Sequence, residues 1–243
     1  MPKDQVAQEA SSTEAFRVPY ALLCELEGVA VDARHAEYEA LCSLLAEQKV
    51  DLPASLFARH CLNLAPSVYL PRLAEALESR KSFPEGLADD IKDGVALFLS
   101  SAEATLRPMV ADFLKRARNR NMEIALLTSA KESIARTLTE RWGEGNPHTR
   151  LFSFEPGTHP FPRADVWLRM AKSLSLAPHQ CVALVGSRCS AKAALSAGMR
   201  CIAIPDEFTS FEDFSGVDAV LDDSGPINAA HWLDLVAPPK PLF

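Results

Sequence analysis

Short apolar runs rich in branched residues alternate with longer stretches of helical periodicity along the chain. The runs are YALLCEL (20–26), EIALLTS (123–129), CVALVGS (181–187), RCIAIPD (200–206) and the weaker DAVLDD (218–223). A near-continuous apolar strand followed by a helix, repeated in this way, is typical of a parallel sheet covered by helices on both faces. The pattern therefore predicts an α/β fold whose strands are joined by right-handed crossovers.

The spacing of the predicted strands is uneven in one place. About a hundred residues separate the first two runs, and residues 35–102 carry only helical periodicities, as in HAEYEALCSLLAEQ. Because open α/β sheets bind ligands beyond the carboxyl ends of their strands, we expect this helical insert to cover that edge as a cap. Residues 144–165 form a second irregular segment, rich in turns and prolines, and ordered loops of this length are often functional.

The charge balance narrows the classes of partner. Thirty-two acidic against twenty-five basic residues give a formal net charge of -7, which disfavours nonspecific binding to nucleic acid or to an anionic membrane surface. The chain has no run of about 18 apolar residues that could span a bilayer, and its polar first fifteen residues lack the apolar core of a signal peptide. We therefore expect no nucleic-acid partner, no membrane partner and a cytoplasmic location.

The six cysteines are scattered without a CxxC pair, and several lie in apolar runs. This pattern predicts reduced, mostly buried thiols rather than a disulfide or zinc framework. Cys189, in a loop-like setting, is the candidate for a reactive thiol, although no histidine near it in sequence supports a nucleophile.

The first strand ends in an unusual pair of acids, Glu25 and Glu27, followed by a glycine. Alternation in an extended strand end points both side chains the same way. The order of features is then an acid-x-acid-Gly-x-x-x-Asp motif, a helical insert, a strand ending in Thr-Ser, a proline-rich loop, a further strand and an Ala-Gly-Met turn. This order resembles the haloacid dehalogenase superfamily, in its phosphatase and β-phosphoglucomutase-like branch. The resemblance covers roughly residues 18–236 and rests on CELEGVAVD, IALLTSA, QCVALVGSRCSAKAALSAGMRCIAI and Pro108.

The resemblance implies a domain organisation. A Rossmann-like core is expected over residues 16–34 and 103–236, with the helical cap over residues 35–102. Residues 1–15 and 237–243 are expected to be loosely held tails.

The resemblance also implies phosphoryl transfer, in which one aspartate attacks phosphorus, a second acts as general acid and base, and Mg²⁺ holds nucleophile and phosphate together. Glu25 and Glu27 stand at these two aspartate positions. Each glutamate adds one methylene, about 1.5 Å of reach, and a misplacement of about 1 Å can lower a rate about a hundredfold. The exchange of both acids therefore predicts weakened catalysis.

The magnesium site implied by the family is incomplete. The family places one or two acids directly after a strand, where this chain has Val185, Gly186, Ser187 and Arg188, and no carboxylate occurs from Val182 to Met199. Magnesium is usually held by one or two carboxylates together with water and phosphate. We predict no metal site, and a permanent positive charge from Arg188 close to the place of the cation.

Other positions favour an anion site. Thr128 matches the family's phosphate-binding hydroxyl. In THPFPRADVW, His159 or Phe161 takes the position of the family's lysine, and Arg163 is a substitute cation. The candidate substrate- or anion-binding residues are Thr128, Ser129, His159, Arg163, Gly186, Ser187 and Arg188. A Gly-Ser turn at a helix N-terminus supplies backbone N–H groups to an anion. The competing interpretation makes VGSRCSAKAAL a tight turn with an N-cap serine, and makes the glutamates part of an ion cluster with Arg188, Arg163 or Lys131.

Two functional hypotheses remain. The first is a protein with lost or very weak metal-dependent phosphatase activity, and no assigned cofactor, that retains a cleft for an anionic or phosphorylated small molecule or for a protein partner. The second is an active small-molecule phosphatase with Glu25 as nucleophile, Glu27 as acid and base, and Mg²⁺ as cofactor. Because two neighbouring carboxylates need a counter-charge, the first hypothesis predicts a contact of about 3 Å from Arg188 to Glu25 or Glu27.

Overall fold

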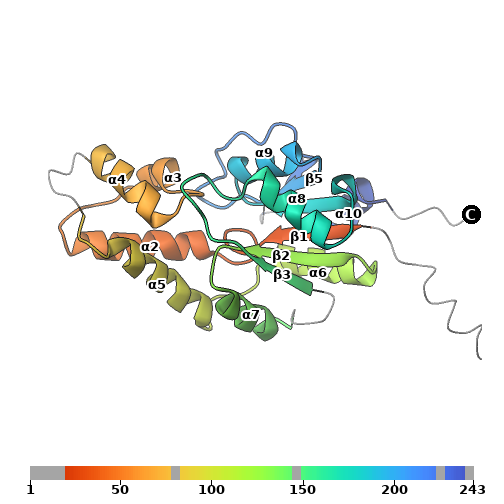
Figure 1. The fold of residues 1–243 in the computed structure, drawn as a ribbon, viewed down its shortest axis with the longest axis horizontal. Helices are drawn as coiled ribbons and strands as arrows, with labels where there is room; N and C mark the ends of the chain where they lie inside the picture. Colours follow the sequence, from red (N-terminus) through yellow and green to blue (C-terminus); the bar gives the residue numbers. More distant parts are fainter. Residues whose placement is uncertain (1–19, 78–82, 144–148, 223–227, 239–243) are drawn as a thin grey trace, which may run out of the picture.

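The parallel sheet predicted from the apolar runs is present. A computed structural model describes residues 20–77, 83–143, 149–222 and 228–238. The predicted tail of residues 1–15 lies outside the described residues, as does most of the predicted tail of residues 237–243. The six strands are all parallel, in the order β3-β2-β1-β4-β5-β6 (Figure 1). They are β1 (Ala21–Glu25), β2 (Glu123–Thr128), β3 (Thr149–Ser153), β4 (Cys181–Val185), β5 (Arg200–Ala203) and β6 (Ala219–Val220).

Helices cover both faces of this sheet, as an α/β sheet with continuous apolar strands requires. One apolar cluster contains side chains of α6 (Pro108–Asn119), α7 (Glu132–Arg141) and α10 (Ala229–Val236). The cluster on the opposite face contains side chains of α8 (Ala164–Ser173) and α9 (Arg188–Ser196). A short 3-10 helix, η2 (Pro178–Gln180), precedes β4.

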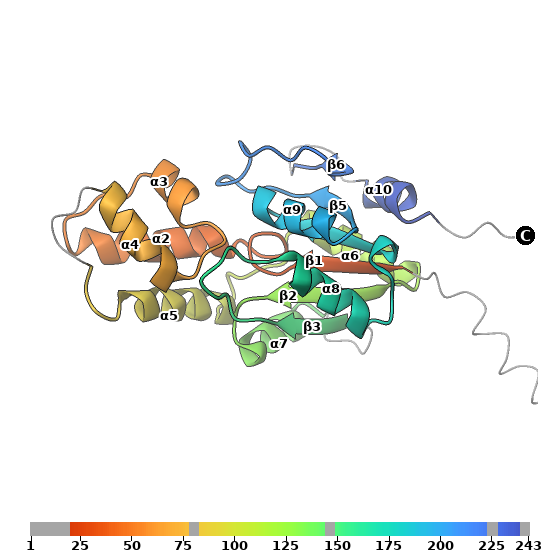
Figure 2. The same ribbon diagram turned by 45° about the horizontal axis from the view of Figure 1, so that its top comes forward.

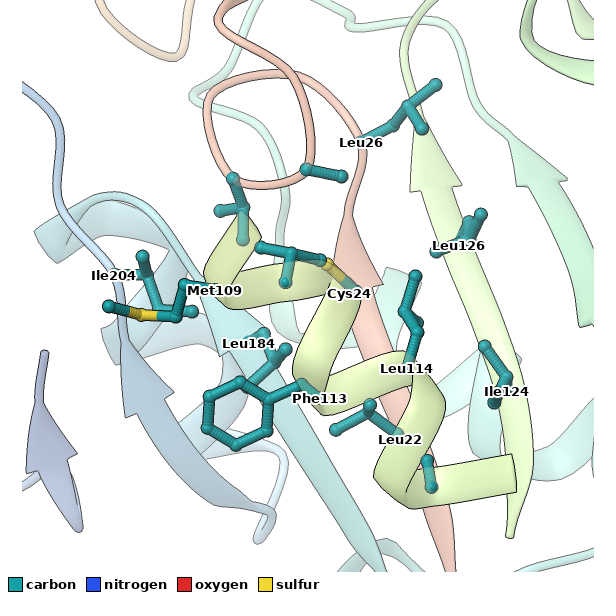
Figure 3. Packing of buried hydrophobic residues seen from close by; sticks show 14 of the residues in the cluster. Leu22, Cys24, Leu26, Met109, Phe113, Leu114, Ile124, Leu126, Leu184 and Ile204 are labelled. Atoms are coloured by element: carbon teal, nitrogen blue, oxygen red, sulfur yellow. The ribbon is translucent and has the colours of Figure 1, made fainter. Parts of the chain in front are cut away.

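Alternation along β1 divides its side chains between the two faces. Leu22 and Cys24 belong to the first cluster, whereas Ala21 and Leu23 belong to the second. Figure 3 shows α6 lying over β1 among these buried side chains, which include Phe113, Leu184 and Leu22. Fully burying a leucine or phenylalanine side chain contributes roughly 1.5–3 kcal/mol, so this packing fixes the central strand.

A helical cap lies between β1 and β2 in the sequence. It consists of α2 (Ala33–Ala46), α3 (Ala54–His60), α4 (Pro66–Ala76) and α5 (Leu87–Ser100). These helices share their own buried apolar cluster, which includes Leu41, Phe57, Tyr69 and Ile91. Figure 2 places the cap beside the end of the sheet toward which β1 runs. The cap is therefore inserted after the first strand, while the exact domain boundaries remain a prediction.

The core also contributes to the cap's apolar cluster. Phe208, from the loop after β5, is buried there. Its ring centroid lies 5.3 Å from that of Tyr38 and 5.0 Å from that of Phe57. Cap and core are thus held together by shared apolar packing. Within the described part of the chain, no helix has the length and apolarity needed to cross a bilayer.

Candidate functional site

The site lies where the central strands end. β1 pairs with β2 on one side and β4 on the other, all parallel, so their carboxyl ends share one edge of the sheet. The chain turns sharply after β1, where Gly28 adopts φ +76° and its N–H donates to the Val31 carbonyl at 2.8 Å. This turn leads directly into α2 of the cap, and it places side chains from sheet and cap side by side.

Glu25 is held inside the protein. Its side chain is buried, with 5% of the residue exposed. The carboxylate accepts a hydrogen bond from the Gly186 N–H at 3.0 Å and another from the Ser190 hydroxyl. Burial raises the pKa of Glu25, while the Arg34 charge and these two hydrogen bonds oppose that shift. Both carboxylate oxygens therefore already have partners within the protein.

Glu27 points to the end of β2. Its Oε1 accepts from the Thr128 hydroxyl at 2.6 Å, the Ser129 N–H at 3.2 Å and the Ala130 N–H at 3.1 Å. Burial raises the pKa of Glu27, and these hydrogen bonds oppose the shift. Successive backbone N–H groups and a hydroxyl form a concavity suited to an anion. The carboxylate of Glu27 occupies that concavity.

The cation beside these acids is Arg34, from the first turn of α2. Its Nη1 donates to Asp206 Oδ2 at 2.6 Å, and its Nη2 lies 3.9 Å from Glu25 Oε2. The contact predicted for Arg188 is wrong. The Arg188 side chain is exposed at the start of α9, and no ion pair joins it to Glu25 or Glu27 within the described residues. The backbone N–H of Arg188 donates a hydrogen bond to Glu212 Oε2 at 2.7 Å.

The remaining predicted residues fall into two groups. Gly186 and Ser187 lie at the site, and Ser187 caps α9 by accepting a hydrogen bond from the Ser190 N–H at 3.2 Å, as the N-cap interpretation proposed. His159 and Arg163 are exposed. Arg163 pairs with Asp165 at 3.0 Å, and His159 lies 3.2 Å from the Thr158 hydroxyl. Whether these two residues bind an anion remains a prediction.

Cys189 does not have the character of a reactive thiol. It is half-buried. Burial, together with the charges of Glu25 and Glu212, raises the pKa of this thiol to about 11. A thiol nucleophile requires the thiolate, so Cys189 stays protonated at neutral pH.

A cavity of about 110 Å³ lies between the cap and the sheet edge. Its lining includes Glu25, Glu27 and Ser129 from the core, and Arg34, Glu37 and Asn63 from the cap, with Phe161 and Pro162 from the proline-rich loop. The loop predicted to be functional therefore reaches the site, but through apolar side chains rather than through His159 or Arg163.

Two cap residues at this cavity carry further polar contacts. Tyr69 donates to Glu37 Oε1 at 2.9 Å, and burial raises the pKa of Glu37 to about 7. Asn63 Nδ2 donates to the Phe161 carbonyl at 2.7 Å, and the Phe161 N–H donates back to the Asn63 carbonyl at 2.8 Å. The sequence analysis missed both residues and Arg34. The available signal was the proximity of Arg34 to the acid pair, only seven residues after Glu27.

With Arg34 in place, the site does not suit a divalent cation. In the described ranges, no three or more His, Cys, Asp or Glu side chains are grouped to hold a metal ion. The position after β4 offers the backbone of Gly186, and the Arg34 guanidinium lies against it, with Nη1 3.2 Å from the Gly186 carbonyl oxygen. The magnesium site implied by the family therefore does not fit these residues.

Two relatives align with much of the chain. Protein CbbY of Cereibacter sphaeroides is 29% identical over 176 residues, which cover 69% of this chain and 76% of CbbY. The putative phosphatase YhcW of Bacillus subtilis (strain 168) is 25% identical over 217 residues, which cover 88% of this chain and 96% of YhcW. No protein-family model matches the chain.

Solved structures share the fold. The β-phosphoglucomutase of Clostridium difficile superposes with a TM-score of 0.69 at 17% identity, covering 89% of this chain and 96% of the enzyme. A HAD family hydrolase from Deinococcus radiodurans R1, with bound phosphate and sodium, superposes with a TM-score of 0.66 at 20% identity, covering 93% of this chain and all of that one. The ordered motifs, the relatives and the common fold agree: the chain has a haloacid dehalogenase-like fold and resembles the phosphatase branch of that superfamily.

Proposed function

We propose that this chain is a phosphatase-like protein whose metal-dependent phosphatase activity is lost or very weak, and which retains a ligand cleft between the cap and the sheet. One observation carries the proposal. The hydroxyl of Thr128 and the N–H groups of Ser129 and Ala130, which would receive a phosphoryl group, already bind the carboxylate of Glu27. Phosphoryl transfer depends mainly on positioning and charge neutralisation at that group.

The state of Glu25 supports the same conclusion. A carboxylate nucleophile must approach phosphorus to about 3–3.5 Å with its lone pair free. Glu25 is buried and accepts hydrogen bonds from Gly186 and Ser190. Burial and these two hydrogen bonds hold the Glu25 carboxylate in its present orientation, so the arrangement stabilises the resting state.

The ligand of the cleft is proposed to be a small anionic or phosphorylated molecule. The HAD family hydrolase with bound phosphate is a structural neighbour, and the cavity favours a small molecule over a protein partner. The anion must displace Glu27 from Thr128, Ser129 and Ala130, because those are the neutral donors that converge at the sheet edge. We therefore expect weak phosphate binding by the wild-type protein.

An active phosphatase is the second candidate. Glu25 and Glu27 line the same cavity, and one relative is a putative phosphatase. In that mechanism Glu25 attacks phosphorus and Glu27 moves a proton to or from the leaving group or water. Glu27 would first have to leave its three donors.

Turnover of p-nitrophenyl phosphate and of a sugar phosphate, with and without Mg²⁺, separates the two candidates. We expect the wild-type rate to equal that of Glu25→Gln. Thermal unfolding with added phosphate is measured on the same preparations. Glu27→Ala vacates the donors, so we expect phosphate to raise its melting temperature more than that of wild type. Glu103→Ala is the matched control, because it removes the negative charge of an exposed glutamate outside the site.

The proposal is overturned by Mg²⁺-dependent turnover that disappears in Glu25→Gln. The explanation through Glu27 is wrong if phosphate shifts wild type, Glu27→Ala and Glu103→Ala equally. A Glu27→Ala/Thr128→Val double variant should lose the phosphate response, since it lacks the hydroxyl donor.

A further inference from the structure

The guanidinium of Arg34 sits in a shell of oxygen atoms. Nη1 lies 2.6 Å from Asp206 Oδ2, 3.2 Å from the Gly186 carbonyl oxygen and 3.3 Å from the Gly28 carbonyl oxygen. Nη2 lies 3.9 Å from Glu25 Oε2. Two carboxylates and two main-chain carbonyls thus surround one side chain, and they come from the ends of β1 and β4 and from the loop after β5.

Carboxylate and carbonyl oxygens are also the ligands that hard divalent cations prefer. The shell therefore has the chemistry of a cation site, and its position at the ends of β1 and β4 is the place where the family resemblance implies Mg²⁺. The guanidinium of Arg34, in the first helix of the cap, fills this shell.

The main chain is shaped around this guanidinium. A Cβ atom on Gly28 would lie 2.3 Å from Arg34 Cζ, and a Cβ atom on Gly186 would lie 2.8 Å from Arg34 Nη1. Both distances are too short for any real contact. A Cβ atom on Gly186 would also lie 2.8 Å from the Gly28 carbonyl oxygen and 2.9 Å from Val29 Cγ2, so the turn after β1 and Arg34 together leave no room for a side chain at this position.

The positive charge of Arg34 and the negative charges of Glu25 and Asp206 stabilise each other. Arg34 is 8% exposed and Glu25 is 5% exposed. The charges of Asp206 and Glu25 raise the pKa of Arg34 against the effect of burial, and an arginine stays protonated in proteins in any case. A buried charge that loses its partner is strongly unfavourable. The carboxylates thus require a cation, and Arg34 supplies it permanently.

We propose that the Arg34 guanidinium is the resident cation of this site and takes the place of a divalent metal ion. The guanidinium is covalently attached and planar, and its Nη1 is shared among three oxygen atoms. It neutralises Glu25 and Asp206 but offers no exchangeable position to a phosphoryl oxygen. The inference concerns the same site as the proposed function, but it is tested by stability and ion binding rather than by turnover, so each can fail without the other.

Chemical rescue tests the inference. Arg34→Ala leaves the oxygen shell without a cation, and we expect a lower melting temperature than that of wild type. Free guanidinium at low millimolar concentration, or Mg²⁺, should then raise the melting temperature of Arg34→Ala by about 3 °C. The wild-type protein should show no such rise, and calorimetric titration of wild type with Mg²⁺ should show no stoichiometric binding.

Two further variants serve as controls. Arg34→Met fills the space without a charge, so it should be destabilised yet respond to neither ion. Asp206→Asn combined with Arg34→Ala removes one carboxylate of the shell and should reduce the response. If Arg34→Ala does not fold, Arg34→Lys decides the question, because its ammonium also occupies the shell. A folded Arg34→Lys protein that ignores Mg²⁺ supports the inference.

Three results would overturn it. The first is stoichiometric Mg²⁺ binding by wild type that is lost in Glu25→Gln. The second is a folded Arg34→Ala protein that responds to neither guanidinium nor Mg²⁺. The third is an Arg34→Lys protein whose melting temperature rises with Mg²⁺.

Discussion

The two carboxylates at the end of β1 are separated by their partners. Glu25 turns toward β4 and accepts from Gly186 and Ser190, whereas Glu27 turns toward β2 and accepts from Thr128. A third acid, Glu37, faces the same cavity from the cap and accepts from Tyr69. Since burial raises the pKa of all three carboxyls, the site couples protonation to stability.

Glu37 gives a specific pH dependence. Its pKa rises from an ordinary value of 4.5 to about 7, because burial outweighs the Tyr69 hydrogen bond and the Arg34 charge. A carboxyl whose folded pKa is raised binds its proton more tightly in the native state. Its contribution to stability is therefore complete below pH 4.5 and is lost as the pH rises through about 7.

We expect Glu37→Gln, which keeps the protonated shape, to match wild type near pH 4.5 and to be more stable by about 2 kcal/mol at pH 8. Urea denaturation of both proteins across this range measures the difference in unfolding free energy. Glu75→Gln, elsewhere in the cap, is the matched control and should run parallel to wild type. A difference between Glu37→Gln and wild type that stays constant with pH would contradict the assignment.

Parallel strands deliver their carboxyl ends to one edge of the sheet, and this edge brings together Glu25, Glu27, Thr128 and Gly186, which the family resemblance assigned to one site. The expectation that Glu25 and Glu27 point the same way is wrong, because β1 ends at Glu25 and the chain turns before Glu27. Arg34 was missed although it follows Glu27 by only seven residues, and Glu37 and Asn63 were missed because their positions depend on how the cap docks. The choice of Arg188 as counter-charge was wrong because Arg188, at the start of α9, is exposed to solvent.

At the scale of elements, the turn between β1 and α2 joins the core to the cap. Gly28 has φ +76°, and a Cβ atom there would collide with the Arg34 guanidinium. Gly143 has φ +74°, but nothing lies within 4 Å of the corresponding position. Both glycines thus adopt a positive φ that disfavours other residues. Only Gly28 also has a neighbouring side chain, that of Arg34, in the space that a Cβ atom would need.

We expect Gly143→Ala to cost about 1 kcal/mol of unfolding free energy, the usual penalty for a non-glycine residue in the left-handed region. Gly28→Ala should cost about 3 kcal/mol, because it also displaces the guanidinium from Glu25 and Asp206. Urea denaturation measures both. In an Arg34→Ala background, the cost of Gly28→Ala should fall toward that of Gly143→Ala. An unchanged cost there would show that the turn, rather than Arg34, requires the glycine.

Most strands were predictable from their continuous apolar runs, but β3 was not. Its sequence, TRLFS, is partly exposed at every position, since β3 lies at the edge of the sheet. An edge strand has neither the uninterrupted apolar run of a central strand nor a clear alternation. It was therefore absorbed into the turn-rich segment of residues 144–165. Hydrophobic pattern predicts the centre of a parallel sheet better than its margin.

At the scale of the whole molecule, three contacts close the cap over the sheet edge. Phe208 packs into the apolar cluster of the cap. His35 of α2 pairs with Glu207 at 2.5 Å. Asn63, in the connection between α3 and α4, exchanges two hydrogen bonds with Phe161 of the core loop. These contacts hold the cap against the core beside the cavity, whose lining includes Asn63 and Phe161.

A substitution at Asn63 can weaken the contact between cap and core without straining the backbone. It has φ +62°, a conformation that glycine adopts freely, so Asn63→Gly removes the side-chain hydrogen bond to the Phe161 carbonyl and keeps the backbone. Loss of one hydrogen bond of about 1 kcal/mol corresponds to roughly a fivefold increase in the population of the open cap. We expect amide hydrogen exchange over residues 154–163 to accelerate by about that factor, with β1 and β4 unchanged. Asn121→Gly is the matched control, because Asn121 has φ +53° at an exposed turn. Equal acceleration in both variants, or exchange that rises throughout the sheet, would mean that Asn63 stabilises the fold as a whole rather than the closed cap.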